Sequence, residues 1–422
     1  MVPKGWSESY LGEVVTYKKG YAFNSSLYAE EGIRIVRISD TTRDSIHSDN
    51  PVFIAGGNVE GLEQYSLFEN DIILSTVGSR PHLLDSMVGK AVKVPRSAHN
   101  SLLNQNLVKL IPKKTKITNE YLFSMLKKKE FIQFISNLVR GNANQVSITL
   151  ADLFKYKFIL PSLPEQKKIA QILSTWDKAI SVTEKLLTNS QQQKKALMQQ
   201  LLTGKKRLLD ENGTRFSETW KLYALSKLFQ RVTTKNNGKS NNVVTISGQH
   251  GLIKQEDFFK KTVASDTLDG YFLLKKGQFA YNKSYSNGYP MGAIKRLNRY
   301  PEGVVTTLYI CFELTTPKKS CGDYWEHYFE SGLLNNSLSQ IAHEGGRAHG
   351  LLNVKPSDFF SLKVAVPGFE EQQKIASVLS AADTEISTLE KKLACLKDEK
   401  KALMQQLLTG KRRVKVDEAV AV

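Results

Sequence analysis

The residues of this 422-residue chain with the clearest chemical potential lie in short polar stretches, the first of which follows a predicted strand. Residues 75–80, Ser-Thr-Val-Gly-Ser-Arg, combine small side chains, which allow close backbone approach, with an arginine that can contact phosphate or guanine. Residues 281–289, Tyr-Asn-Lys-Ser-Tyr-Ser-Asn-Gly-Tyr, interleave aromatic rings, amides and a lysine. Asparagine can read the edge of adenine, and lysine can reach guanine or phosphate. Both stretches therefore indicate contacts to nucleic acid.

Two further loops repeat this chemistry. Residues 140–145 read Arg-Gly-Asn-Ala-Asn-Gln, and residues 345–350 read Gly-Gly-Arg-Ala-His-Gly. For any single side chain an ordinary hairpin tip is an equally good interpretation, but that interpretation weakens for the whole set in a basic chain. The predicted DNA-binding residues are Ser79, Arg80, Arg140, Asn142, Asn144, Gln145, Lys283, Tyr285, Asn287, Tyr289, Arg347 and His349.

Most catalytic signatures are absent from the sequence. It contains no glycine-lysine phosphate loop of an NTPase, and Asn287-Gly288-Tyr289-Pro290 has letters of a DNA methyltransferase motif in a different order, which favours a turn. His343 and His349 are six residues apart through two glycines, whereas a metal-binding pair on a helix needs a four-residue step. We therefore expect no catalytic residue, no metal and no cofactor in this chain.

The charge balance points to a polyanionic partner. The chain has 59 basic and 41 acidic residues, a net charge of +18, and a hydrophobic content of 41% that indicates folded domains. Its three cysteines form no metal-like spacing and are typical of a reducing compartment. No apolar run approaches the ~18 residues of a membrane span. These features predict a cytoplasmic protein that does not contact a membrane.

The elements that must position the polar loops form two modules. Short β-like runs cover residues 33–39, 71–77, 89–94 and 104–112, and a helical period covers residues 118–139. The second module has strand-like runs at residues 243–247, 304–314 and 362–366, and a helical stretch near residues 324–341. Trp6 and Trp220 open the two modules, but their interiors share little sequence. We expect one scaffold used twice to recognise different targets.

The connectors between and after the modules are the clearest repeat. The phrase KALMQQLLTGK fills residues 195–205 and returns at residues 401–411, an offset of 206 residues. Before each copy the apolar residues step by threes and fours, which predicts a helix of some 40 residues with a narrow apolar seam. Lys194 and Lys400 occupy seam positions, and Gly204 stands where a helix-ending glycine belongs. Because each seam needs a partner, we expect the two helices to pair.

These patterns predict a mixed α/β fold with pseudo-twofold symmetry. Two globular domains would be joined by two long helices that pair with one another. The predicted ranges are 1–160 for the first domain, 161–205 for the first helix, 206–366 for the second domain, 367–411 for the second helix and 412–422 for a tail.

The connectors also carry a family resemblance. Residues 161–170, Pro-Ser-Leu-Pro-Glu-Gln-Lys-Lys-Ile-Ala, open a helix that ends in Leu-Thr-Gly-Lys, and residues 366–376 repeat this beginning. This layout resembles the specificity subunit of Type I restriction–modification enzymes over essentially the whole chain. The second copy has Gly368-Phe369-Glu370 without the proline found at Pro164.

The resemblance implies a non-catalytic subunit that recognises a bipartite, asymmetric sequence in double-stranded DNA with two target-recognition domains. It also implies that the two long helices pack as an antiparallel coiled coil, which acts as a spacer. Two methyltransferase (M) subunits would dock on it and use S-adenosylmethionine, and restriction (R) subunits would complete the nuclease. Two other interpretations remain open from the sequence: a coiled-coil scaffold whose basic charge is incidental, and, third, a methyltransferase in its own right.

Overall fold

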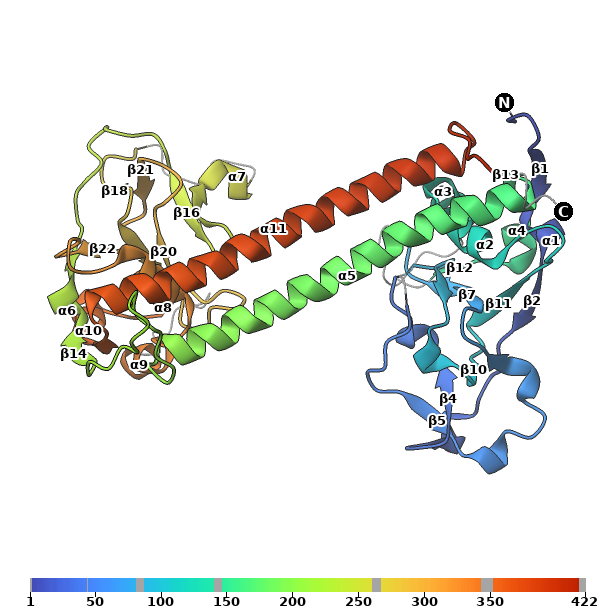
Figure 1. Cartoon of the computed structure of the whole chain (residues 1–422), viewed down its shortest axis with the longest axis horizontal. Coiled ribbons are helices and arrows are strands. Elements are labelled where there is room, and N and C mark those ends of the chain that lie inside the picture. Colours follow the sequence, from blue (N-terminus) through green and yellow to red (C-terminus); the bar gives the residue numbers. More distant parts are fainter. Residues whose placement is uncertain are drawn as a thin grey trace. The chain divides into compact units, whose positions relative to one another are not determined.

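The computed structural model describes residues 2–43, 45–80, 87–139, 146–259, 267–342 and 352–416. It divides into two compact units, Met1–Thr183 with Lys392–Val422, and Glu184–Lys391. Each unit is a mixed α/β body that contains part of both long helices, α5 (Leu163–Leu201) and α11 (Phe369–Leu407), which are traced in Figure 1. The predicted mixed α/β fold with two long helices is confirmed.

The first unit is built around a four-stranded antiparallel sheet in the order β2 (Val15–Lys19), β11 (Leu107–Pro112), β7 (Ile72–Ser75), β9 (Ala91–Lys93). All four residues of β7 are buried. Its Ile72 and Leu74 join a core with α2 (Asn119–Leu126) and α3 (Lys129–Leu138), whereas Ile73 joins a separate cluster on the other face. Figure 1 shows α2 and α3 beside the part of α5 that belongs to this unit.

The first unit also contains a five-stranded sheet. Its strands stand in the order β3 (Tyr28–Ala29), β5 (Val52–Ile54), β4 (Ile33–Val36), β10 (Ser101–Leu103), β6 (Ser66–Leu67). The strand expected over residues 33–39 ends at Val36, so that expectation is too long. The Asp40 carboxylate accepts the backbone N–H of Arg37 at 2.9 Å and turns the chain into the 3₁₀ helix Ile38–Asp40.

The second unit repeats the four-stranded sheet as β15 (Phe229–Arg231), β22 (Ile310–Leu314), β19 (Phe279–Asn282), β20 (Ala293–Arg296). In place of the five-stranded sheet it has two strand pairs, β16 (Val244–Ser247) with β17 (Gly251–Lys254) and β18 (Phe272–Lys275) with β21 (Glu302–Val305). The expectation of a common scaffold with different interiors therefore agrees with the two sheet patterns.

One further strand pair follows the same repeat. In the first unit β1 (Ser7–Tyr10) pairs with β13 (Lys157–Leu160), and in the second β14 (Lys221–Ala224) pairs with β23 (Lys363–Val366). The short elements are α1 (Leu11–Val14), β8 (Val77–Gly78), β12 (Val146–Ser147), α4 (Leu150–Leu153), α6 (Leu225–Leu228), α7 (Gln255–Phe259), α8 (Gly322–Glu330), α9 (Asn335–Ile341) and α10 (Pro356–Ser361).

Three sequence-based elements are each divided in two. The helix expected over residues 118–139 breaks at Lys127 and Lys128 between α2 and α3. The helix expected near residues 324–341 breaks around Gly332, whose φ of +75° cannot continue a right-handed helix. The strand expected over residues 304–314 is β21 and β22, because the backbone N–H of Tyr309 bonds back to the carbonyl of Thr306 and turns the chain.

The long helices pair antiparallel inside each unit. In the first unit Ile169 and Leu173, from the start of α5, share a core with Leu407 and Leu408, from the end of α11. In the second unit the end of α5 packs in the same way on the start of α11, with Leu201 and Leu379 in one core. Gly204 and Gly410 follow the helices with φ of +71° and +68°, as the helix-ending glycine prediction requires.

The seam lysines are explained by partners on the opposite helix. Lys194 forms an ion pair with Asp383 in the second unit, and Lys400 forms one with Asp177 in the first. Both lysines are more than three-quarters buried at the side chain, and the two pairs are related by the 206-residue offset. A polar pair at a defined seam position specifies helix register. These pairs therefore favour one antiparallel alignment.

We expect Lys400→Asp to destabilise the first unit by about 1–2 kcal/mol, because it replaces an attraction by a repulsion beside Asp177. The double variant Lys400→Asp/Asp177→Lys should recover most of that loss. Chemical denaturation of the wild type, both single variants and the double variant measures the coupling, and Lys194 with Asp383 offers a matched second pair. A double variant no more stable than Lys400→Asp would contradict a register role.

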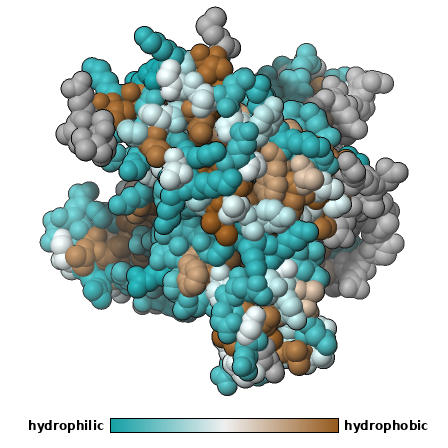
Figure 2. Space-filling view, turned by 90° about the vertical axis from the view of Figure 1, so that its right-hand side faces the viewer, coloured by the Kyte–Doolittle hydropathy of each residue, from teal (hydrophilic) through white to brown (hydrophobic). Residues whose placement is uncertain are grey.

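The surface is mainly hydrophilic on the face drawn in Figure 2, where hydrophobic residues form separate small patches. Within the described ranges, no helix is long and apolar enough to cross a bilayer.

Candidate nucleic-acid interface

The candidate loops at residues 75–80 and 281–289 occupy equivalent places in the two units. Residues 76–80 follow β7, and residues 283–289 follow β19, the third strand of each four-stranded sheet. The carbonyl of Thr76 accepts the N–H of Ile148 at 3.1 Å, and the carbonyl of Lys283 accepts the N–H of Leu352 at 2.8 Å. Each module has two candidate loops, residues 76–80 and 140–145 in the first and residues 283–289 and 345–350 in the second. Each bond joins the first candidate loop of a module to the segment that follows its second candidate loop in the sequence. The fold thus bonds the described segment after each second candidate loop to the first candidate loop of the same module.

Several loops of the first unit converge with residues 76–80, and we call this set the first recognition edge. It comprises residues 20–23, 37–43, 45–50, 76–80, 104–106 and 146–148. The N–H groups of Gly20 and Thr76 bond to the carbonyls of Leu107 and Asn106, each at 3.0 Å. A Cβ on Gly20 would lie 1.9 Å from the Asn104 carbonyl oxygen, so only glycine permits this close approach.

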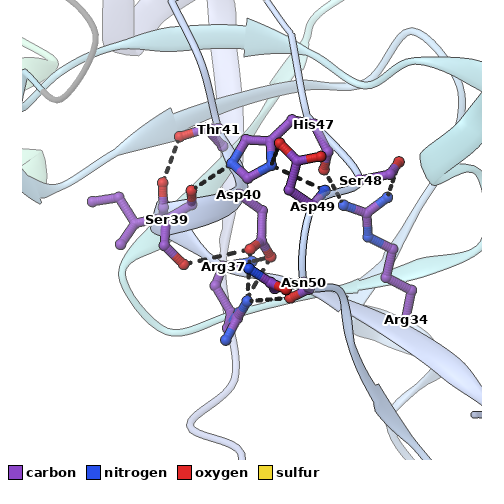
Figure 3. Close-up of polar contacts among 10 residues, drawn as sticks. Arg34, Arg37, Ser39, Asp40, Thr41, His47, Ser48, Asp49 and Asn50 are labelled. Atoms are coloured by element: carbon purple, nitrogen blue, oxygen red, sulfur yellow. Dashed lines mark hydrogen bonds and ion pairs between the residues drawn. The ribbon is translucent and has the colours of Figure 1, made fainter. Parts of the chain in front are cut away.

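The segment between β4 and β5 is the part of this edge that the sequence interpretation missed. Figure 3 shows its polar network. Asp40, with 1% of its surface exposed, accepts from the Arg37 guanidinium at 2.8 Å. His47 Nε2 lies 2.8 Å from the Ser39 carbonyl oxygen, and Arg34 donates to the carbonyl of His47 at 2.5 Å. These contacts hold the segment in one shape by its own side chains.

Two lysines from outside also anchor this segment. Buried Lys90 donates to the Thr41 carbonyl at 2.8 Å, and Lys127 donates to the Arg43 carbonyl at 2.6 Å. The only sequence signal for this loop was a polar run, residues 39–50, which any surface turn could also produce.

In the second unit the loop after β19 has a fixed base and an exposed tip. Lys283 is half-buried and donates to the Val354 carbonyl at 3.3 Å; burial and the nearby Arg231 charge lower the pKa of its ammonium. Tyr285 is 63% exposed, and Asn287 is also exposed. The turn prediction for residues 287–290 agrees with the bonded bridge between Ser286 and Tyr289.

Tyr289 is held inside the protein instead of at the tip. Its hydroxyl oxygen lies 2.5 Å from a carboxylate oxygen of Glu330 and 2.8 Å from the Gly248 carbonyl oxygen, and it accepts from Lys295 at 2.9 Å. Burial and the Glu330 carboxylate raise the pKa of this phenol. The contacts favour a role in positioning the loop, and base contact by Tyr289 stays a prediction.

Of the other predicted DNA-binding residues, two lie in the described part of the chain and the rest lie outside it. Ser79 is half-buried and Arg80 exposed on the first recognition edge. Six candidates lie outside the described residues: Arg140, Asn142, Asn144, Gln145, Arg347 and His349. The histidine pair considered for a metal lies outside them too. Across the described ranges, no group of three or more histidine, cysteine, aspartate or glutamate side chains could hold a metal ion.

Each module is joined to the helices by the same three side chains, which we call the clasp. In the first unit Glu165, at the start of α5, accepts from the Trp6 indole at 3.0 Å and from Arg413 at 2.8 Å. In the second unit Glu371, at the start of α11, accepts from the Trp220 indole at 3.0 Å and from both Nε and a terminal nitrogen of Arg207 at 2.6 and 2.7 Å.

The clasp explains three features of the repeat. The tryptophan opens the module, the glutamate opens one helix, and the arginine follows the glycine that ends the other helix. The guanidinium also lies over the indole, 5.6 Å from the ring centroid for Arg413 and 5.8 Å for Arg207. The clasp therefore fastens a recognition module to both helices at once.

The glutamine beside each clasp glutamate anchors a module helix. Gln166 accepts the N–H of Thr118, the N-cap of α2, and Gln372 accepts the N–H of Cys321, the N-cap of α8, both at 2.9 Å. Each amide also donates to the carbonyl of the proline that precedes its helix. Because these bonds are buried, the Glu-Gln repeat has a structural reason.

Comparison with known proteins agrees with this layout. The family described as Type I restriction modification DNA specificity domain matches residues 3–189. A putative Type I restriction enzyme MjaX specificity subunit from Methanocaldococcus jannaschii is 25% identical over 98% of this chain and 95% of its own length. Residues 3–189 thus match a Type I specificity domain, and the whole chain is similar to a Type I specificity subunit.

Two further comparisons extend the match. The MjaVIII specificity subunit of the same organism is 28% identical over 50% of this chain and 48% of its own length. The crystal structure of the Type I restriction–modification S subunit from M. genitalium covers 96% of both chains, with 15% identity and a TM-score of 0.57. At 15% identity, the latter similarity shows the fold alone.

Proposed function

We propose that this chain is a Type I specificity subunit that reads a bipartite, asymmetric DNA sequence, with one half-site bound by each recognition module. The observation that carries the proposal is a backbone hydrogen bond that recurs at the equivalent place in the two modules. In both units a backbone bond joins the loop after the third sheet strand to the segment after the second candidate loop. The exposed side chains there, including Arg80, Tyr285 and Asn287, can contact phosphates and base edges.

The different interiors of the two modules support an asymmetric site. The first module has a five-stranded sheet and an anchored loop between β4 and β5, whereas the second has two separate strand pairs. Different loops on one scaffold present different hydrogen-bonding groups, so the half-sites should differ in sequence. We assign residues 1–160 and 206–366 as the two recognition domains.

We assign residues 161–205 and 367–411 as the spacer between them, with 412–422 as a tail. A 39-residue helix is about 58 Å long at 1.5 Å per residue. Two such helices, aligned by the Lys–Asp pairs, would hold the two readers at a set spacing. A set spacing produces a gap of constant length between the half-sites.

The chemistry belongs to partner subunits in this proposal. The similarity to Type I specificity subunits supports assembly with M subunits, two per specificity subunit, and with R subunits. The chain itself would carry no catalytic site, and the M subunits would bind S-adenosylmethionine. The basic net charge of +18 suits the phosphate contacts that any such complex needs.

The test is DNA selection with the full chain and its M subunit. A random duplex library, selected by binding and sequenced, should yield two defined half-sites separated by a gap of constant length. Arg80→Ala should relax or weaken the first half-site, and Asn287→Ala the second, each by about 1–3 kcal/mol.

Replacement of an exposed lysine away from both edges, such as Lys185→Ala on α5, provides the control. Selection of no sequence, with equal binding to scrambled duplexes, would refute the proposal and favour the scaffold interpretation. Binding of S-adenosylmethionine by the isolated chain would instead favour a methyltransferase.

A further inference from the structure

Tyr21 is an exposed aromatic side chain on the first recognition edge. It follows β2 and Gly20, and 40% of its surface is exposed. Its backbone is fixed because its N–H donates to the Leu103 carbonyl at 2.9 Å. The backbone of Tyr21 is therefore held against the segment between β10 and β11, and Asn106 of that segment accepts the N–H of Thr76 at the start of the loop after β7.

The surroundings of Tyr21 form a small aromatic platform. Its ring centroid lies 5.0 Å from that of Phe23 and 5.2 Å from that of Tyr65. Phe23 and Tyr65 pack on the buried cluster of Ile35, Ile54 and Leu102, whereas Tyr21 is not part of that cluster. Tyr21 is thus the outer ring of a supported stack, not a core residue.

The platform also carries positive charge. Lys18 Nζ lies 5.2 Å from the centroid of the Tyr65 ring and bonds to Gln64. Exposed Lys19 is the next residue of the same strand. Aromatic rings beside lysines are the combination that binds nucleic-acid bases, since the ring contacts the base and the cations attract the backbone. The net charge of +18 also favours a polyanion over a protein surface as the partner of this platform.

We propose that Tyr21 makes a direct apolar contact to one base of the half-site read by the first module. The contact is with the 5-methyl group of a thymine in the major groove or, if the complex unstacks the duplex at that step, with the flat face of the base. This inference rests on the proposed function and adds a specificity-determining residue to it.

The strand itself offers a matched control. Tyr17 has a similar exposure, 45%, but its ring packs on Phe154 with a centroid distance of 5.1 Å. On β2, Tyr17 pairs with Leu110 and Lys19 pairs with Val108. Tyr17 therefore lies two residues further from the first recognition edge than Lys19. The two tyrosines therefore differ in position relative to the loops and not in residue type or exposure.

The experiment measures affinity of the full chain with its M subunit for the duplex selected by the wild-type complex. Tyr21→Ala should lose about tenfold or more in affinity, the range typical of a base–aromatic contact. Tyr21→Phe should stay within about twofold, because the ring is kept. Tyr17→Ala should bind like the wild type, and binding to a scrambled duplex should change in no variant.

DNA modifications locate the contact and also test it with the wild-type chain. Each thymine of the first half-site is replaced by deoxyuridine, and each base in turn by an abasic site. At one position the loss from the DNA change should largely disappear in Tyr21→Ala. Non-additivity with deoxyuridine identifies a thymine methyl group, and non-additivity with the abasic site alone identifies the base face.

Three results would overturn the inference: an unchanged affinity for Tyr21→Ala, losses that add at every position, or weakened M-subunit association with unchanged DNA affinity. The last would assign the platform to a protein. A wild-type complex that prefers no sequence would instead overturn the proposed function.

Discussion

Glu371→Ala should lower the free energy of unfolding of the second unit by about 3 kcal/mol, because it leaves a buried cation and an indole N–H without their acceptor. The Glu371 side chain is 3% exposed, and Arg207, which binds it through two nitrogens, is 19% exposed. The Trp220 indole loses its bond in the same substitution. Chemical denaturation followed by tryptophan fluorescence measures the change.

The adjacent residue gives the control for this variant. Glu370 lies in the first turn of the same helix and is exposed, so Glu370→Ala should change stability by less than about 0.5 kcal/mol. Equal losses for the two variants would show that the clasp contributes nothing specific. In the first unit Arg413 is 43% exposed, so Glu165→Ala should cost less than Glu371→Ala.

Trp325→Ala should destabilise the second unit by about 3–5 kcal/mol, since it removes the largest buried side chain of its core. The indole is fully buried and packs on Phe229, Tyr324 and Tyr328 with centroid distances of 5.1 to 5.3 Å. Its N–H donates to Ser320 at 2.8 Å. Trp325→Phe, which retains an aromatic ring, should lose less than half as much.

Hydrogen exchange distinguishes this local effect from general unfolding. Protection should fall in β15, β19, β22 and α8, which surround Trp325, and persist in β7, β11 and α2 of the first unit. Equal loss of protection in both units would contradict independent cores. The selected DNA should then lose its second half-site while the first remains readable.

Much of the architecture could be predicted from the sequence because it rests on local or repeated patterns. The seam of each long helix has the helical period, and glycine ends each helix because it adopts positive φ without strain. The 206-residue repeat predicted which residues of the two helices are equivalent, and α5 and α11 begin and end at equivalent residues. This holds although α11 lacks a proline equivalent to Pro164. The strand before residues 76–80 was likewise visible from its apolar run, whereas β19, the strand before residues 283–289, was not predicted.

Other features depended on contacts between distant segments. Trp6, Glu165 and Arg413 stand far apart in the chain, and their residue types alone predict no pairing. The seam lysines interrupt the apolar pattern of each helix, and only the structure shows that Asp177 and Asp383 lie opposite them. The loop between β4 and β5 was missed because its shape is maintained by Asp40, His47 and the distant Lys90.

The sequence by itself determined two similar modules, two long paired helices and a basic, loop-based reader. Only the tertiary structure decided which loops share an edge, where Tyr21 stands and how the clasp joins each module to both helices. The physical reason is that helix period, turn chemistry and charge act over a few residues. Loop convergence and buried polar pairing depend instead on strand order and on which distant groups satisfy one another's hydrogen bonds.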